Sequence, residues 1–119
     1  MKFTNKEIYS IWNVIWKRFF DMTSSTQSPV RSVKQMAHFD TFCRKQFGMS
    51  VIEVKQGCEY EMMNMNLLEG TDYIVSMMSK EKKELLLSNL NDAVYIDSDI
   101  DEKQVSFLEW TTKRLKKTN

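Results

Sequence analysis

The sequence has few of the residues that interrupt helices or cross-link small folds. Of its 119 residues one is Pro (Pro29) and three are Gly, while Leu, Met, Lys and Glu are frequent. Such a composition favours helices joined by short turns. The two cysteines, Cys43 and Cys58, are too few for a disulfide framework, so we expect a cytoplasmic protein.

Several larger features are also missing from the sequence. No apolar run approaches the roughly 20 residues that span a membrane, and the first residues lack the features of a signal peptide. No stretch alternates long enough to predict a sheet. With one His, no Gly-rich phosphate loop and no nucleophile elbow, we expect no enzyme. The sequence therefore predicts a single all-α domain over residues 1–119, a compact bundle of about five to seven helices.

The charges are divided unevenly along the chain, although the net charge is only +1. Residues 1–58 carry nine Lys or Arg and four Asp or Glu, whereas residues 59–119 carry eight and twelve. This division allows weak nucleic-acid binding through the basic N-terminal half, but mutual attraction of the two halves explains it at least as well. Nucleic acid is therefore an alternative partner and not the expected one.

Capping signals mark the helices of the first half. Thr4 with Glu7 and Ser50 with Glu53 fit capping boxes, and Ser28-Pro29 fits an N-cap followed by Pro at the first helical position. Apolar residues at helical spacing then predict buried faces for three helices. They are Ile8, Ile11, Trp12, Ile15 and Phe19; Val30, Val33, Met36, Ala37, Phe39, Cys43 and Phe47; and Val51, Val54, Cys58, Met62 and Met65. Ser10, Asn13 and Lys17 are expected on the polar face of the first helix, and Gly70 is expected to break the chain before a short helix over residues 72–78.

The stretch from residue 78 to residue 115 carries two further helices joined by an acidic turn, Asp97-Ser98-Asp99-Ile100-Asp101. Ser79 is expected to cap the first of these helices. Asp101 is expected to cap the second, because Gln104 stands where a capping-box partner reaches back and Ile100 and Val105 fit a hydrophobic staple. On this last helix Phe107 and Trp110 lie on a different side from the main apolar face. The helix is therefore either buried on two sides or offers Phe107 and Trp110 to a partner.

This succession of features resembles the repeated helix–turn–helix element of the tellurite-resistance TerB-like family. The resemblance covers Asp97, Ser98, Ile100 and the helix after Asp101, is clear over about residues 72–115, and is faint over residues 1–50. It implies a TerB-like helical bundle with a degenerate helix–turn–helix pseudo-repeat. It also implies a cytoplasmic, stress- or envelope-associated interaction module, and in TerB the acidic residues of such turns are implicated in divalent-metal binding. Here Ser98 and Gln104 depart from the family pattern.

The acidic turn is a candidate metal site, because Asp97, Asp99 and Asp101 alternate like the first ligands of an EF-hand loop. Glu102 and Leu108 stand where that loop needs a Gly and a bidentate Glu. The alternative is a capped turn with solvated carboxylates at a positive helix end. We expect no cofactor, with weak Ca²⁺ or Mg²⁺ binding at Asp97, Asp99 and Asp101 as the alternative.

Two further interpretations of side chains complete the prediction. His38, Cys43 and Cys58 have no usual zinc spacing, so the histidine is expected in solvent and the cysteines in the core. The function expected from the sequence is a non-catalytic protein-interaction module that binds a protein partner or a second copy, with Phe107 and Trp110 as the partner-binding residues. The alternatives are a divalent-cation-binding module and a weak nucleic-acid binder.

Overall fold

Six helices make up the part of the chain described by this computed structural model, which comprises residues 2–61 and 67–116. The first helix is continuous and consists of α1 (Asn5–Ser10), a π-helical segment η1 (Ile11–Trp16) and α2 (Lys17–Met22). The others are α3 (Pro29–Phe47), α4 (Val51–Tyr60), α5 (Leu67–Met77), α6 (Lys80–Val94) and α7 (Glu102–Leu115). These residues contain no strand, which confirms the all-α bundle of five to seven helices.

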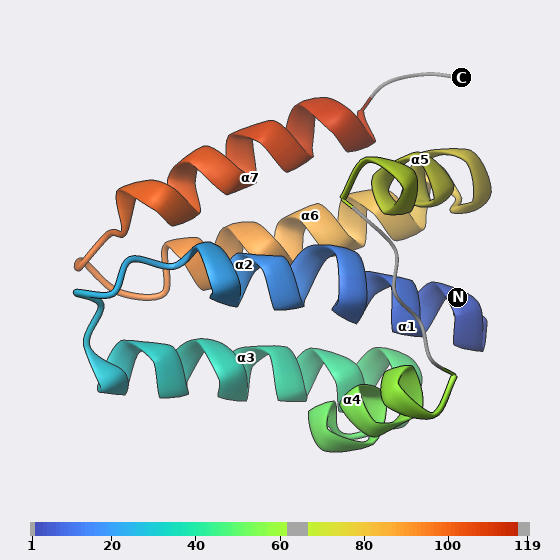
Figure 1. The fold of residues 1–119 in the computed structure, drawn as a ribbon, viewed down its shortest axis with the longest axis horizontal. Helices are drawn as coiled ribbons and strands as arrows, with labels where there is room; N and C mark the ends of the chain where they lie inside the picture. The colour runs from blue at the N-terminus through green and yellow to red at the C-terminus, as the bar shows by residue number, and fades with distance from the viewer. Residues whose placement is uncertain (1, 62–66, 117–119) are drawn as a thin grey trace.

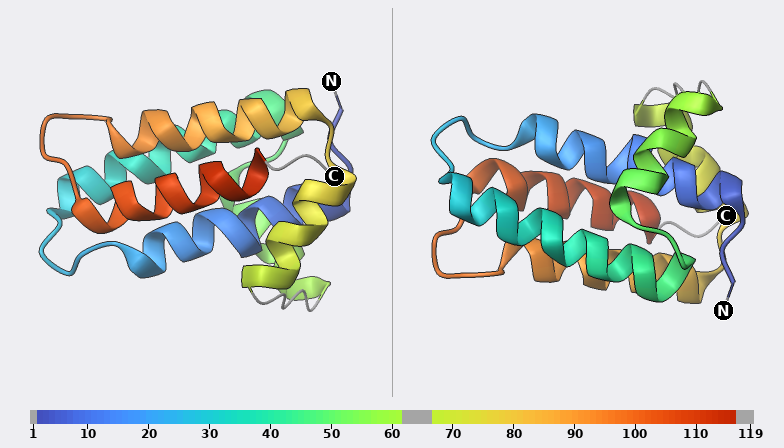
Figure 2. Two further views of the ribbon diagram at one scale, coloured as in Figure 1. Left: turned by 90° about the horizontal axis from the view of Figure 1, so that it is seen from above. Right: turned by 90° about the horizontal axis from the view of Figure 1, so that it is seen from below.

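The four long helices lie side by side, and the short α4 and α5 cross them near one end (Figures 1 and 2). The first helix runs through the middle and contacts α4, α5 and α7, while α6 packs against both α3 and α7. At the other end, the turn before α3 meets the turn before α7 (Figure 1). Within the described ranges no helix is both long and apolar enough to cross a membrane.

Five of the predicted helix starts agree with the structure, whereas α5 begins at Leu67 and not at the predicted residue 72. Thr4 and Ser50 form complete capping boxes with the residues three positions later, and Ser28, Ser79 and Asp101 each accept a backbone N–H as N-caps. Gly48 ends α3 in the left-handed conformation (φ 69°). The predicted third helix ends at Tyr60, and its Met62 and Met65 lie outside the described residues.

The middle of the first helix departs from the prediction in two ways. The segment η1 is π-helical, and all six of its side chains are buried. Ser10 and Asn13, which were expected on a polar face, are 0% and 9% exposed because α4 and α5 cover that side of the helix. The predicted buried face of this helix is confirmed and Lys17 is exposed as expected, whereas the placement of Ser10 and Asn13 was wrong because the helix lies at the centre of the bundle with neighbours on several sides.

Two glycines lie inside helices because other helices approach them closely. A Cβ at Gly57 would lie 2.5 Å from the ring of Tyr9, and a Cβ at Gly70 would lie 2.2 Å from a methyl group of Val14. Gly70 is buried within a continuous α5, so the predicted chain break at this residue was wrong. Its role is to let α5 pack against η1.

We expect Gly70→Ala to destabilise the protein and Gly57→Ala to be nearly neutral. Val14 is fully buried and β-branched, so overpacking at Gly70 costs about 1–3 kcal/mol, more than the roughly 1 kcal/mol of helix propensity that Ala adds. Tyr9 is only half-buried, and its ring can swing away from a new methyl group at position 57. Urea denaturation of the two variants gives the comparison, and equal stabilities would contradict the close packing of α5 on η1.

Candidate functional site

The acidic turn between α6 and α7 is held against the rest of the bundle by its own aspartates. Asp101 uses Oδ1 to accept the N–H groups of Lys103 (2.9 Å) and Gln104 (3.2 Å), and its Oδ2 accepts the N–H of Ser24 (3.0 Å). Asp97 pairs with Arg31 through Oδ1, which also accepts the N–H of Asp99 at 3.0 Å. The turn is thus joined both to the loop after α2 and to α3.

The hydrogen bond from the Asp99 N–H and the nearby Arg31 and Lys34 hold the pKa of Asp97 below its ordinary value, although partial desolvation opposes them. A carboxyl group with a lowered pKa in the folded state stabilises the fold while it is ionised. This contribution is present above the unfolded pKa of about 4 and is lost as the pH falls through the lower, folded value.

Arg31 is the centre of a polar network inside the bundle. Its side chain is 1% exposed, and each of its three nitrogens has a partner. Nε donates to Gln27 Oε1 (2.9 Å), Nη1 pairs with Asp97, and Nη2 donates to the Val94 carbonyl (2.6 Å) and to Gln104 Oε1 (3.3 Å). Arg31 therefore places a positive charge at the carboxyl end of α6, where it interacts favourably with the negative end of the helix dipole.

Two buried glutamines complete this network. Gln35 donates to the Ala93 carbonyl (2.9 Å) and to Gln104 Oε1 (2.9 Å), while Gln104 donates to Thr23 Oγ1 (2.9 Å) and to Gln35 Oε1 (3.0 Å). The predicted capping box was wrong in this respect, because the Gln104 side chain turns into the bundle and does not reach back to Asp101. Gln35 and Arg31 together supply donors to the last carbonyls of α6.

A cleft of about 310 Å³ opens beside the network, where the two turns meet. Its walls include Ser24, Thr26, Gln27, Arg31, Asp99 and Lys103. Because the nitrogens of Arg31 are all engaged by protein groups, this cleft presents no buried cation without a partner. We therefore assign no ligand to it.

Two of the three aspartates of the turn have oxygens that are already engaged by protein groups. Both oxygens of Asp101 already accept backbone N–H groups, and Asp97 is paired with a buried guanidinium. Among residues 2–61 and 67–116 no group of three acidic, His or Cys side chains is arranged to hold a metal. Long-range contacts that the spacing does not reveal thus engage Asp97 and Asp101, and metal binding at Asp97, Asp99 and Asp101 stays a prediction.

We accordingly expect calorimetric titration with Ca²⁺ or Mg²⁺ to show no affinity tighter than about millimolar, the range of weak extracellular sites. Asp97→Asn is the matched variant, since it removes one carboxylate from the turn. Micromolar affinity in the natural protein that disappears in Asp97→Asn would contradict this expectation.

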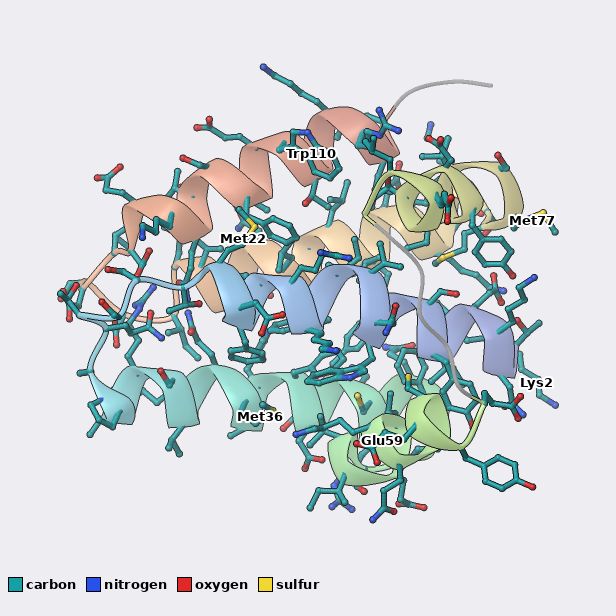
Figure 3. All side chains as sticks on the ribbon, viewed as in Figure 1. Lys2, Met22, Met36, Glu59, Met77 and Trp110 are labelled. Atoms are coloured by element: carbon teal, nitrogen blue, oxygen red, sulfur yellow. The ribbon has the colours of Figure 1, made fainter. Side chains whose placement is uncertain are left out.

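The structure separates the two predicted partner-binding aromatics. Phe107 is 2% exposed and packs against Phe19, with ring centroids 6.4 Å apart, so its prediction as a surface residue was wrong. Trp110 is half-buried, stacks on Phe107 and has the Arg114 guanidinium 5.7 Å from its ring. Figure 3 shows Trp110 on α7 and, at the end of α2, Met22, which is 44% exposed. For Phe107, the structure therefore agrees with the other interpretation of α7, in which this helix is buried on two sides.

In the first half of α3, the face that was predicted to be buried is exposed to solvent. Val30 and Val33, which were predicted to be buried, are 65% and 68% exposed, and Ala37 is exposed as well. The side that faces the bundle instead carries Arg31 and Gln35. We refer to Val30, Val33 and Ala37 as the α3 stripe. Sequence reasoning missed it because apolar residues at helical spacing normally mark the buried face of a helix.

The histidine and the cysteines have structural environments. Cys43 and Cys58 are buried as predicted, and burial raises the pKa of Cys43 to about 12 and that of Cys58 to about 11. His38 is half-buried and not free in solvent, because its Nε2 lies 3.1 Å from Asn89 Nδ2 and 3.2 Å from the Asn89 carbonyl oxygen. His38 therefore joins α3 to α6.

Comparison of the chain with protein-family models, with curated proteins and with solved structures finds no significant match.

Proposed function

We propose that the protein is a non-catalytic protein-interaction module whose docking face is the α3 stripe. The observation that carries the proposal is which face of α3 is buried. Val30, Val33 and Ala37 lie on the surface, while Arg31 and Gln35 are buried. The resemblance of residues 72–115 to TerB-like proteins favours the same class of function, a cytoplasmic interaction module.

The location of the stripe also favours docking. It lies on the half of α3 nearer the two turns, whereas α4 packs against the other half (Figures 1 and 3). Covering the two valines with a partner would contribute about 1–2 kcal/mol each from apolar burial. That gain accompanies little ordering cost, because α3 is already fixed in the bundle by the contacts of Arg31 and Gln35.

Partner capture with surface variants tests this proposal. The tagged protein, its Val33→Asp variant and its Leu68→Asp variant would be recovered from cells of the native organism, and the bound proteins quantified by mass spectrometry. Leu68 on α5 is the matched control, since it is 58% exposed but belongs to a different face. We expect Val33→Asp to lose a discrete set of proteins that Leu68→Asp retains.

The opposite outcome is equally clear. Urea denaturation first shows whether both variants are folded. If folded variants capture the same proteins as the natural chain, the α3 stripe is not the docking face. Loss of the same proteins from both variants would also exclude it, because a general effect of the added charge would then explain the result.

A further inference from the structure

Positive charge surrounds the α3 stripe. Lys34 and Arg44 have side chains 53% and 66% exposed, and Lys45 is exposed near the carboxyl end of the same helix. The first turn of α3 contains no acidic residue, so no carboxylate of the helix opposes the positive end of its dipole. Apolar and positive surface thus occur together on one helix.

Two carboxylates offset part of this positive charge. The one acidic residue of the helix is Asp40, which accepts from Arg44 Nε (2.8 Å) and from the Val51 N–H (2.8 Å). Asp97 approaches Lys34 only at 3.9 Å and is already paired with Arg31. The four basic residues of α3 outnumber these two carboxylates, so a partner with negative charge of its own would complement this face.

The spacing of the stripe indicates the shape of that partner. Val30, Val33 and Ala37 are separated by three and then four residues, which places them in one row along the helix. This is the spacing with which one α-helix packs along another, and Lys34 occupies a flanking position where such pairs commonly place opposite charges. A helix with a matching apolar row would cover all three side chains at once.

We infer, on the basis of the proposed function, that the docking face binds an acidic amphipathic helix of another protein. Its apolar residues would cover the α3 stripe, and its Asp or Glu side chains would face Lys34 and the basic residues near the carboxyl end of α3. The stripe itself argues against a nucleic acid, because phosphates would pair with the lysines but leave the valines against polar surface.

A second copy of the chain fits the face less well. Among the described helices α5 lacks Lys and Arg, and Leu68 and Met77 are exposed apolar residues among its described side chains. They are nine residues apart, which places them on opposite sides of a helix at 100° per residue. The described side chains of α5 therefore form no exposed apolar row that matches the α3 stripe.

Two synthetic helical peptides test the inference, each of about 18 residues so that a helix can form in water. Both carry Leu and Ala in one row at the spacing of the stripe, and the flanking positions are Glu in one peptide and Lys in the other. Binding to the full chain would be followed by its amide NMR spectrum. We expect the Glu peptide alone to bind saturably, with shifts centred on residues 28–41.

Charge reversal and controls sharpen this test. Lys34→Glu should weaken binding of the Glu peptide about tenfold and improve binding of the Lys peptide. Val33→Asp should abolish binding of the Glu peptide, and Leu68→Asp should leave it unchanged. Equal binding of the two peptides, no binding, or shifts away from α3 would overturn the inference. So would self-association through α3 in sedimentation, or saturable binding of a DNA oligonucleotide or of anionic phosphatidylserine vesicles at α3 without binding of the Glu peptide. If the Glu peptide fails while Val33-dependent partner capture persists, the docking face stands and the acidic helix does not.

Discussion

The Phe107→Ser variant is expected to lose about 3–5 kcal/mol of folding free energy, the usual cost of removing a buried aromatic ring. Phe107 is 2% exposed and lies between Phe19 and Trp110, with ring centroids 6.4 and 6.5 Å away. Serine would leave a cavity and place a hydroxyl group in apolar surroundings. Urea denaturation followed by tryptophan fluorescence and by circular dichroism would measure the loss.

Two matched variants show whether the loss of stability comes from the burial of Phe107 in the core. Trp110→Ser should cost less than Phe107→Ser, because Trp110 is half-buried. Val33→Asp should have a stability close to that of the natural protein, because Val33 is 68% exposed. If Phe107→Ser were as stable as the natural protein, its ring would belong to the surface and the original partner-binding prediction would be restored.

The parts of the fold that could be predicted from the sequence are those set by local interactions. An N-cap and its partner are separated by two or three residues, so the starts at Thr4, Ser28, Ser50, Ser79 and Asp101 could be assigned from short patterns. The absence of long alternating stretches likewise excluded a sheet. These features do not depend on which helices become neighbours.

The buried face in the first half of α3 could not be predicted, because its cause is distant in the sequence. Hydrophobic periodicity places Val30 and Val33 inside, but the last carbonyls of α6 need donors where α3 passes. Arg31 and Gln35 supply them to Val94 and Ala93, which are 63 and 58 positions away. Long polar side chains can thus determine the buried face of a helix against its apolar pattern.

The acidic turn shows the same limit at the level of a candidate site. Asp97, Asp99 and Asp101 have the spacing of calcium ligands, yet spacing says nothing of what else their oxygens meet. In the folded chain Ser24 and Arg31 engage Asp101 and Asp97 from the other interhelical turn and from α3. The turn therefore serves to join distant segments, and the proposed docking face lies on the helix to which it is joined.

Replacing Arg31 with Met is expected to lower the free energy of unfolding by about 3 kcal/mol, near the lower end of the range for breaking a buried ion pair. Methionine fills similar space but leaves the Val94 carbonyl without its donor and removes the partner of Asp97. Arg31→Lys should lose most of the same stability, since a single ammonium group cannot reach the three sets of acceptors that the guanidinium bridges. Urea denaturation at neutral pH would measure both variants.

Arg44→Met is the matched control, because it removes an arginine from the same helix whose side chain is 66% exposed, and little change is expected from it. A double-mutant cycle with Asp97→Asn then separates the ion pair from the other contacts of Arg31. Since Asp97 is 27% exposed and Arg31 also donates to Val94 and Gln104, the single Arg31→Met variant should cost more than Asp97→Asn. If Arg31→Met were as stable as the natural protein, the polar network would not be what keeps this face of α3 buried. The outward position of Val30 and Val33 would then need another cause.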